Sequence, residues 1–147
     1  MKKRILAMTS LLVLCGFAAT QAAKAQEPLA VNIPFAFTAG EIALPAGEYR
    51  VQKMDSNSAV LLIRCDEPRK SIMVTTNAAG GGKVQEQSKL VFHRYGNQLF
   101  LSQVWTAGYS SGRELRIGHR EKEISLSAKL QKHDEVILVA STFPNKQ

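Results

Sequence analysis

The sequence predicts a single, mainly β domain: an antiparallel β-sandwich or small β-barrel of about seven strands, with one short helix near the C-terminal side. After Gln26 the chain consists of short runs rich in Val, Ile, Phe, Tyr and Leu, separated by Gly, Pro, Asn, Asp and Ser. Residues 26–147 are also enough for one domain with one hydrophobic core.

The first residues have the plan of a signal peptide. Positive charges at residues 2–4 precede an apolar run from Ile5 to Ala19, and an A-x-A pattern ends at Ala25. The apolar run is too short for a transmembrane helix. We therefore expect residues 1–25 to be cleaved and the domain to be exported to the periplasm or the extracellular space. Lipid attachment at Cys15 is an alternative, although Leu14 stands where a small residue is usual.

Removal of the leader changes the charge of the protein. The full chain has 19 Lys and Arg against 12 Asp and Glu. Four of the basic residues lie in the leader, which leaves fifteen against twelve and a net charge of +3. The remaining basic residues are dispersed along the sequence, so nucleic-acid binding, which needs a concentrated positive surface, is not expected. We also expect no cofactor and no stable membrane insertion after signal removal.

Only Cys65 remains after cleavage, so no disulfide can form within the mature chain. At the end of "AVLLIRC" it is predicted to be a small buried side chain. The alternatives are a reactive thiol or a homodimer linked through Cys65.

In the N-terminal part of the domain, the sequence predicts two strands joined by a corner. In "LAVNIPFAFTAG" the larger apolar residues alternate, and Pro34, which lacks an N–H, places the strand at an edge or beside a bulge. In "LPAGEYRV" Pro45 fixes φ, Gly47 permits a conformation that other residues resist, and Tyr49 starts the alternation of the next strand. We interpret these three residues as structural.

Two polar turns, "DSNS" and "DEPRK", delimit the strands "AVLLIRC" and "SIMVTTN". "NAAGGGK" is expected to be a flexible loop. It is not a phosphate-binding loop, because Val84 follows Lys83 where that motif requires Ser or Thr and then a helix.

"KLVFHRYGNQLFLSQVW" predicts a hairpin with Gly96 and Asn97 as its two-residue turn, with Gly96 supplying a positive φ. In that register Tyr95 faces Gln98, His93 faces Phe100 and Val91 faces Ser102. One face is then core (Leu90, Phe92, Leu99, Leu101, Trp105), and the other is mixed and partly covered (His93, Tyr95, Phe100).

The segment from Thr106 to Arg116 is expected to be a loop. After it, "ISLSAKL" alternates as a strand does, whereas its charged prelude favours a helix, and the pattern alone decides neither. "EVILVAST" predicts the last strand.

The blocks "IPFAFTAGEIALPAGEYRV" and "LVFHRYGNQLFLSQVW", followed by "SGREL", resemble a group of small exported bacterial proteins of unknown function. The resemblance covers most of the mature chain and implies no activity. It favours a short helix from His119 to Leu130, where this chain has "EISLSAKL" and the group is richer in alanine and charge.

No catalytic or metal-binding motif is evident. His93, His119 and His133 are far apart in the sequence, and HExxH, CxxC and GxSxG are absent. A Cys65–His93 nucleophilic pair would have to assemble in space. The acidic residues that glycoside hydrolysis would need fall in turns (Asp66-Glu67, Asp134-Glu135) or in the charged segment, where Glu121 and Glu123 are expected to pair with Arg120 or Lys122.

Aromatic and basic residues suggest a ligand-binding surface instead. Tyr109, Arg113, His93, Tyr95 and Trp105 are the candidates, and core packing is the favoured role for Trp105. The sequence therefore predicts a non-catalytic exported module that binds an envelope polymer or protein, or has a structural role in the envelope. The alternative is a small hydrolase acting on an envelope polymer.

Overall fold

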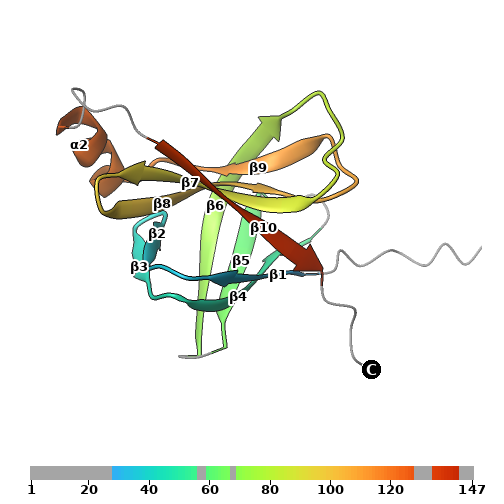
Figure 1. The fold of residues 1–147 in the computed structure, drawn as a ribbon, viewed down its shortest axis with the longest axis horizontal. Coiled ribbons are helices and arrows are strands. Elements are labelled where there is room, and N and C mark those ends of the chain that lie inside the picture. The colour runs from blue at the N-terminus through green and yellow to red at the C-terminus, as the bar shows by residue number, and fades with distance from the viewer. Residues whose placement is uncertain (1–27, 56–58, 67–68, 128–133, 143–147) are drawn as a thin grey trace, which may run out of the picture.

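The computed structural model describes residues 28–55, 59–66, 69–127 and 134–142. The predictions on the signal peptide, its cleavage site and Cys15 fall outside these residues, as do His133 and most of the "DSNS" turn. Within them the chain is mainly β, with one short helix near the C-terminal side, as the sequence predicts (Figure 1).

The described chain contains ten strands where the sequence suggested about seven. Their bounds are β1 Leu29–Ile33, β2 Phe37–Ala39, β3 Ile42–Leu44, β4 Gly47–Lys53, β5 Val60–Cys65, β6 Lys70–Gly80, β7 Ser88–Tyr95, β8 Gln98–Trp105, β9 Ser111–Leu115 and β10 Asp134–Thr142. Two of the extra strands arise because "LAVNIPFAFTAG" is interrupted at Pro34 and "EIAL" pairs back as a strand of its own, β3. The third is β9.

The strands form one sheet in the order β3-β2-β8-β7-β10-β1-β4-β5-β6-β9. All pairings are antiparallel except a single parallel contact between β2 and β8 at Thr38 and Phe100. The sheet bends strongly, so that β7, β8 and β9 lie above β1 and β4 in Figure 1, while β10 runs diagonally from the upper strands down to the end of β1. β9 also pairs with β8, but only at two residue pairs, and the sheet is a sandwich-like, bent sheet that is not closed into a regular barrel.

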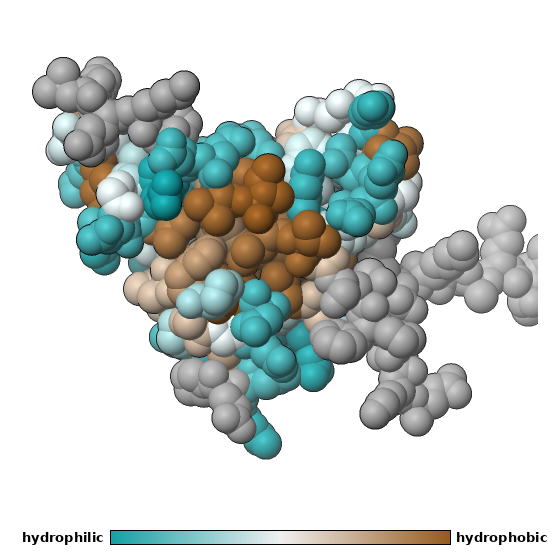
Figure 2. Space-filling view, in the orientation of Figure 1, coloured by the Kyte–Doolittle hydropathy of each residue, from teal (hydrophilic) through white to brown (hydrophobic). Residues whose placement is uncertain are grey.

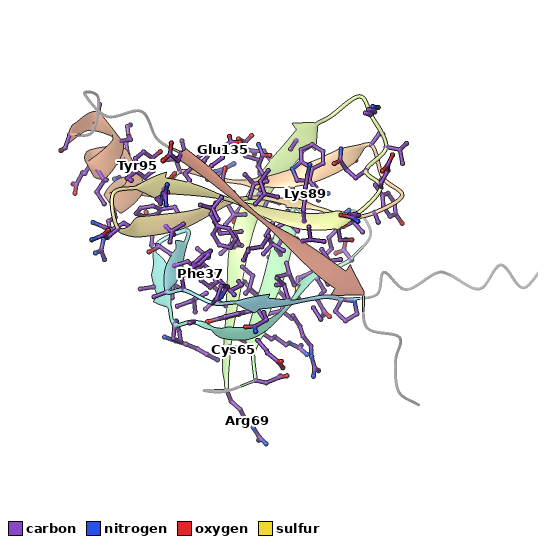
Figure 3. The ribbon with its side chains drawn as sticks, viewed as in Figure 1. Phe37, Cys65, Arg69, Lys89, Tyr95 and Glu135 are labelled. Carbon is purple, nitrogen blue, oxygen red and sulfur yellow. The ribbon has the colours of Figure 1, made fainter. Side chains whose placement is uncertain are left out.

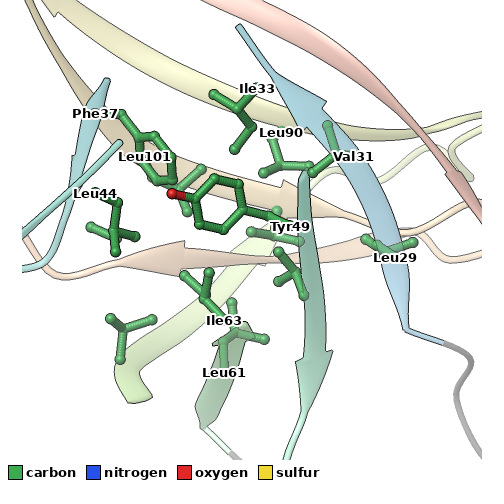
Figure 4. Close-up of a cluster of buried hydrophobic side chains, with 14 of the residues drawn as sticks. Leu29, Val31, Ile33, Phe37, Leu44, Tyr49, Leu61, Ile63, Leu90 and Leu101 are labelled. Atoms are coloured by element: carbon green, nitrogen blue, oxygen red, sulfur yellow. The ribbon is translucent and has the colours of Figure 1, made fainter. Parts of the chain in front are cut away.

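One hydrophobic core fills the space inside the bend. Alternate residues of each strand point into it, including Val31 and Ile33 of β1 and Leu61 and Ile63 of β5. Tyr49 is 1% exposed and lies in the middle of this cluster (Figure 4). Cys65, its register partner on β5, is buried in the same cluster, as the sequence predicts for a small apolar side chain.

The "LPAG" corner joins β3 to β4. The hydroxyl of Tyr49 donates a hydrogen bond of 2.6 Å to the carbonyl oxygen of Pro45. The prediction that Gly47 adopts a conformation that other residues resist is corrected. Gly47 is the first residue of β4 and pairs with Ile33. The described glycines with φ in the left-handed region lie elsewhere, at Gly40, Gly82, Gly96 and Gly108.

The β7–β8 hairpin turns at Gly96 (φ 60°) and Asn97, as predicted, and Tyr95 faces Gln98 while His93 faces Phe100. The register shifts between Phe92 and Val91, so Val91 faces Gln103 and not Ser102. This β-bulge reverses the faces of the residues beyond it. Val104 therefore packs in the main core, and Trp105 does not.

Trp105 instead belongs to a second, smaller cluster with Val91 and Ala79. Trp105 is 8% exposed, so the predicted packing role is confirmed, although in a different cluster.

Parts of two segments expected to be loops are strands. Residues 111–115 form β9, which pairs with β6 from Thr76 to Gly80. That pairing also draws "NAAG" of the predicted glycine loop into β6. The Gly and Ser residues that suggested loops are accommodated because β9 lies between two longer strands.

The helix α2 spans His119–Ser127, and Ala128 to Leu130 lie outside the described residues. Glu41, in the turn between β2 and β3, accepts a hydrogen bond of 2.6 Å from the backbone N–H of His119 and so caps the helix. In the part of the chain that the structure describes, no helix is long and apolar enough to cross a membrane.

Candidate functional site

The five residues predicted to bind a ligand do not form one site. His93 and Tyr95 lie near the turn of the β7–β8 hairpin, beside α2, whereas Tyr109 and Arg113 follow the other end of β8. Figure 3 shows Tyr95 near α2 and Lys89 toward the opposite end of β7. Trp105 is buried against Gly81 and Gly112, at the end of β8 that leads to Tyr109. The two groups are therefore separate candidate sites.

The loop that carries Tyr109 is held by backbone hydrogen bonds to the segment between β6 and β7. Gln85 pairs with this loop twice: its N–H donates to the Tyr109 carbonyl (3.0 Å), and its carbonyl accepts from the Gly108 N–H (2.9 Å). The N–H of Ala107 donates to Ser88 Oγ at 3.0 Å. Hydrogen bonds to Gln85 and to Ser88, the first residue of β7, thus fix the backbone of the loop that carries Tyr109.

Tyr109 is 47% exposed and has a basic residue at its face. Lys53 Nζ lies 5.9 Å from the centroid of the Tyr109 ring. Lys53 ends β4 on the same face as Tyr49 and Val51, so it stands at the open end of the core. Arg113 shares the face of Val104, its partner on β8, and is half-buried at the same end.

The pKa of Lys53 is lowered from its usual value. Burial is the main cause, the positive charge of Arg113 adds to it, and Tyr109 opposes it. Arg113 and Lys53 therefore repel each other, and Lys53 lies over the exposed ring of Tyr109. An anion placed between them would relieve that repulsion.

Trp105 packs against the backbone at this end of the molecule. A Cβ atom built on Gly112 would lie 2.7 Å from the Trp105 ring, and one built on Gly81 would lie 2.8 Å from it. The indole N–H donates to Gln103 Oε1 at 2.9 Å, and Lys89 Nζ lies 5.8 Å from the ring. Because the ring packs against the backbone at Gly81 and at Gly112, Trp105 positions the loops and does not itself offer a stacking surface.

The second group joins the hairpin to the helix. His93 Nδ1 lies 3.0 Å from Glu121 Oε1, and the Tyr95 hydroxyl donates to the same oxygen at 3.4 Å. Glu121 is 5% exposed. The hydrogen bond to Glu121 raises the pKa of His93; burial opposes this, and the charges of Glu121, Glu135 and Glu114 add to it.

Sequence reasoning missed two residues. Glu121 was expected to pair with Arg120 or Lys122, but it is the buried residue of α2 and contacts β7. Lys53 was not considered. Its signal was present in the alternation Tyr49, Val51, Lys53, which places a lysine on the core-facing side of a strand.

The other candidate groups do not assemble. Cys65 packs with Tyr49 in the core, and the Cys65 contact and burial raise the pKa of Tyr49, burial being the larger cause. Figure 3 shows Cys65 in the lower part of the molecule, well away from Tyr95. Cys65 and His93 are therefore not paired.

Two of the carboxylates predicted to lie in turns, Asp66 and Asp134, are in exposed ion pairs. Asp66 pairs with Arg50 at 2.9 Å, and Asp134 pairs with Arg94 at 2.8 Å. Among the described residues, no group of three or more His, Cys, Asp and Glu side chains is arranged to hold a metal ion.

Comparisons of the chain with family models, with curated proteins and with solved structures find no match.

Proposed function

We propose that this protein is a non-enzymatic, exported binding module of the cell envelope and that Tyr109, Lys53 and Arg113 form its ligand-binding surface. The signal-peptide plan of residues 1–25 supports export. The observation that carries the binding proposal is the position of Lys53 over the ring of an exposed tyrosine on a hydrogen-bonded loop, with the charge of Arg113 acting on Lys53.

This arrangement suits a saccharide that carries carboxylate or phosphate groups. The exposed ring of Tyr109 can stack on a sugar ring, and Arg113 can hold an anionic group through paired N–H donors. Lys53 contributes a second positive charge at the same end of the core. Anionic saccharides of this kind are components of bacterial envelope polymers.

The proposal can be tested by titrating the protein with soluble muropeptides that carry free carboxylates, using NMR chemical shifts. We expect shifts centred on Tyr109, Arg113 and Lys53. Tyr109→Ala should weaken binding about fivefold through loss of stacking. Arg113→Gln should weaken it about tenfold or more, because a charge-assisted hydrogen bond is lost.

Matched variants on the same chain control for general effects. Tyr95→Phe changes an aromatic residue at the other end of the hairpin, and Arg116→Gln removes an exposed positive charge outside the site. Both should bind as the wild type does. Unchanged affinity in the double variant Tyr109→Ala/Arg113→Gln would contradict the proposal.

The hydrolase alternative gains no comparable support. A nucleophilic mechanism would need a base beside Cys65, and His93 contacts Glu121 and not Cys65.

A further inference from the structure

The outer face of β10, β1, β4 and β5 combines an exposed apolar strip with a basic depression, and we propose that this face binds an anionic lipid surface. It shares none of its residues with the Tyr109 surface. This face is therefore a second site, and lipid binding here does not depend on ligand binding at the Tyr109 surface.

The apolar strip lies on β10. Val136 and Leu138 of this strand pack against the core, so the alternate residues Ile137 and Val139 point outward, with 54% and 63% exposure. Figure 2 shows apolar residues gathered over the middle of the face that β10 crosses. Large apolar residues that are grouped on a surface mark an interaction site more often than isolated ones do.

The strip continues into a gap between two strands. β10 pairs with β1 only at Leu29 and Ala30, while it pairs with β7 from Asp134 to Ala140. Where β10 and β1 diverge, a depression of about 300 Å³ opens, and its apolar wall consists of Ala30, Val31 and Val139. An apolar chain can therefore lie against this face beyond the two exposed side chains.

A basic depression adjoins the gap. Arg50 and Arg64 are direct register partners on β4 and β5, and like charges placed opposite each other destabilise a sheet. With Arg69 and Lys70 they line a second depression, of about 550 Å³, and Asp66 is the one carboxylate among the described residues of its lining. The sequence shows these basic residues as dispersed, but the strand register brings them together.

The two depressions form one continuous face, because Arg50 and Asp66 line both of them. Their described charged residues are four basic (Arg50, Arg64, Arg69, Lys70) and two acidic (Asp66 and Glu48), a net charge of +2. Each basic residue near an anionic bilayer strengthens binding by about fivefold. Apolar side chains that reach the headgroup boundary add to this. A soluble anion would use the basic part alone, so the lipid surface accounts for more of the face.

The test is co-sedimentation of purified protein, beginning at Gln26, with vesicles of phosphatidylcholine alone and with vesicles of phosphatidylcholine and phosphatidylglycerol in equal parts. We expect binding to the anionic vesicles only, weakened by added salt. Arg64→Gln/Arg69→Gln should reduce binding by a factor of about twenty-five if each residue contributes about fivefold. Ile137→Ser/Val139→Ser should reduce it as well, with far-UV circular dichroism confirming that each variant is folded.

Two matched variants lie elsewhere on the molecule: Ile117→Ser, which alters an apolar side chain with 61% exposure, and Lys122→Gln on α2. Both should bind as the wild type does. Failure of the wild type to sediment with anionic vesicles would overturn the proposal, as would equal losses in the control variants. Full competition by inorganic phosphate, together with unchanged binding of the Ile137/Val139 variant, would assign the basic depression to a soluble anion and also overturn it.

Discussion

The hydroxyl of Tyr49 donates a 2.6 Å hydrogen bond to the carbonyl oxygen of Pro45, four residues earlier in the chain. The ring of Tyr49 is in edge-to-face contact with Phe37, with centroids 5.2 Å apart, and is buried in the core. One side chain therefore joins the β3–β4 corner to the first strands of the sheet, and Figure 4 shows its hydroxyl directed toward the side of Phe37 and Leu44.

Tyr49→Phe should lower the free energy of unfolding by about 1 kcal/mol, because it removes this hydrogen bond and leaves the ring in place. Urea denaturation measures the change. Tyr109→Phe is the control, since Tyr109 is exposed in a loop, and it should have no effect. If Tyr49→Phe were as stable as the wild type, the hydrogen bond to the Pro45 carbonyl oxygen would contribute nothing beyond what water supplies there.

The stability of the protein should depend on pH through His93. Because its folded-state pKa is raised, the pairing with Glu121 stabilises fully below the unfolded value of about 6.5. The stabilisation is lost as pH rises through the raised pKa. Glu121→Gln should reduce this pH dependence, measured as urea midpoints at a series of pH values, whereas His119→Gln should retain it. An unchanged slope in Glu121→Gln would mean that Glu114 and Glu135 control the titration of His93.

Removal of the Glu41 cap should destabilise α2. Glu41→Ala leaves the His119 N–H without its side-chain acceptor and is expected to cost about 1 kcal/mol. Hydrogen exchange of the α2 amides is the direct measurement, and Glu123→Ala, on the exposed side of the helix, is the control.

Gly118→Ala should have a related effect on the same cap, because its Cβ would lie 2.7 Å from both the Gly40 carbonyl oxygen and Glu41 Oε1. Wild-type exchange rates in both variants would show that the cap does not hold the helix.

Gly112→Ala should displace the Trp105 ring. The added Cβ would lie 2.7 Å from the ring and 2.9 Å from the Val104 carbonyl oxygen, and overpacking of this kind costs about 1–3 kcal/mol. Trp105 is the single tryptophan of the chain, so its fluorescence reports the change directly. Gly80→Ala is the matched control, because its Cβ would meet nothing within 4 Å. An unshifted emission spectrum in Gly112→Ala would contradict the tight contact.

The local features of this protein follow from its sequence. The alternation of apolar residues identified most of the strands, and Gly96-Asn97 determined the hairpin turn and its register as far as Phe92. Both depend on residues close together in the chain, where side-chain alternation and turn geometry act directly.

The remaining features depend on contacts between distant parts of the chain. Residues 111–115 form a strand because β6 and β8 supply hydrogen-bonding partners from distant parts of the chain. A bulge at Ser102 moves Trp105 to a different cluster, and packing of α2 on β7 buries Glu121 beside His93. The groups Lys53–Tyr109–Arg113 and Arg50–Arg64–Arg69–Lys70 likewise arise from cross-strand register and bending of the sheet. These depend on which strands become neighbours, and no local pattern of residues encodes that.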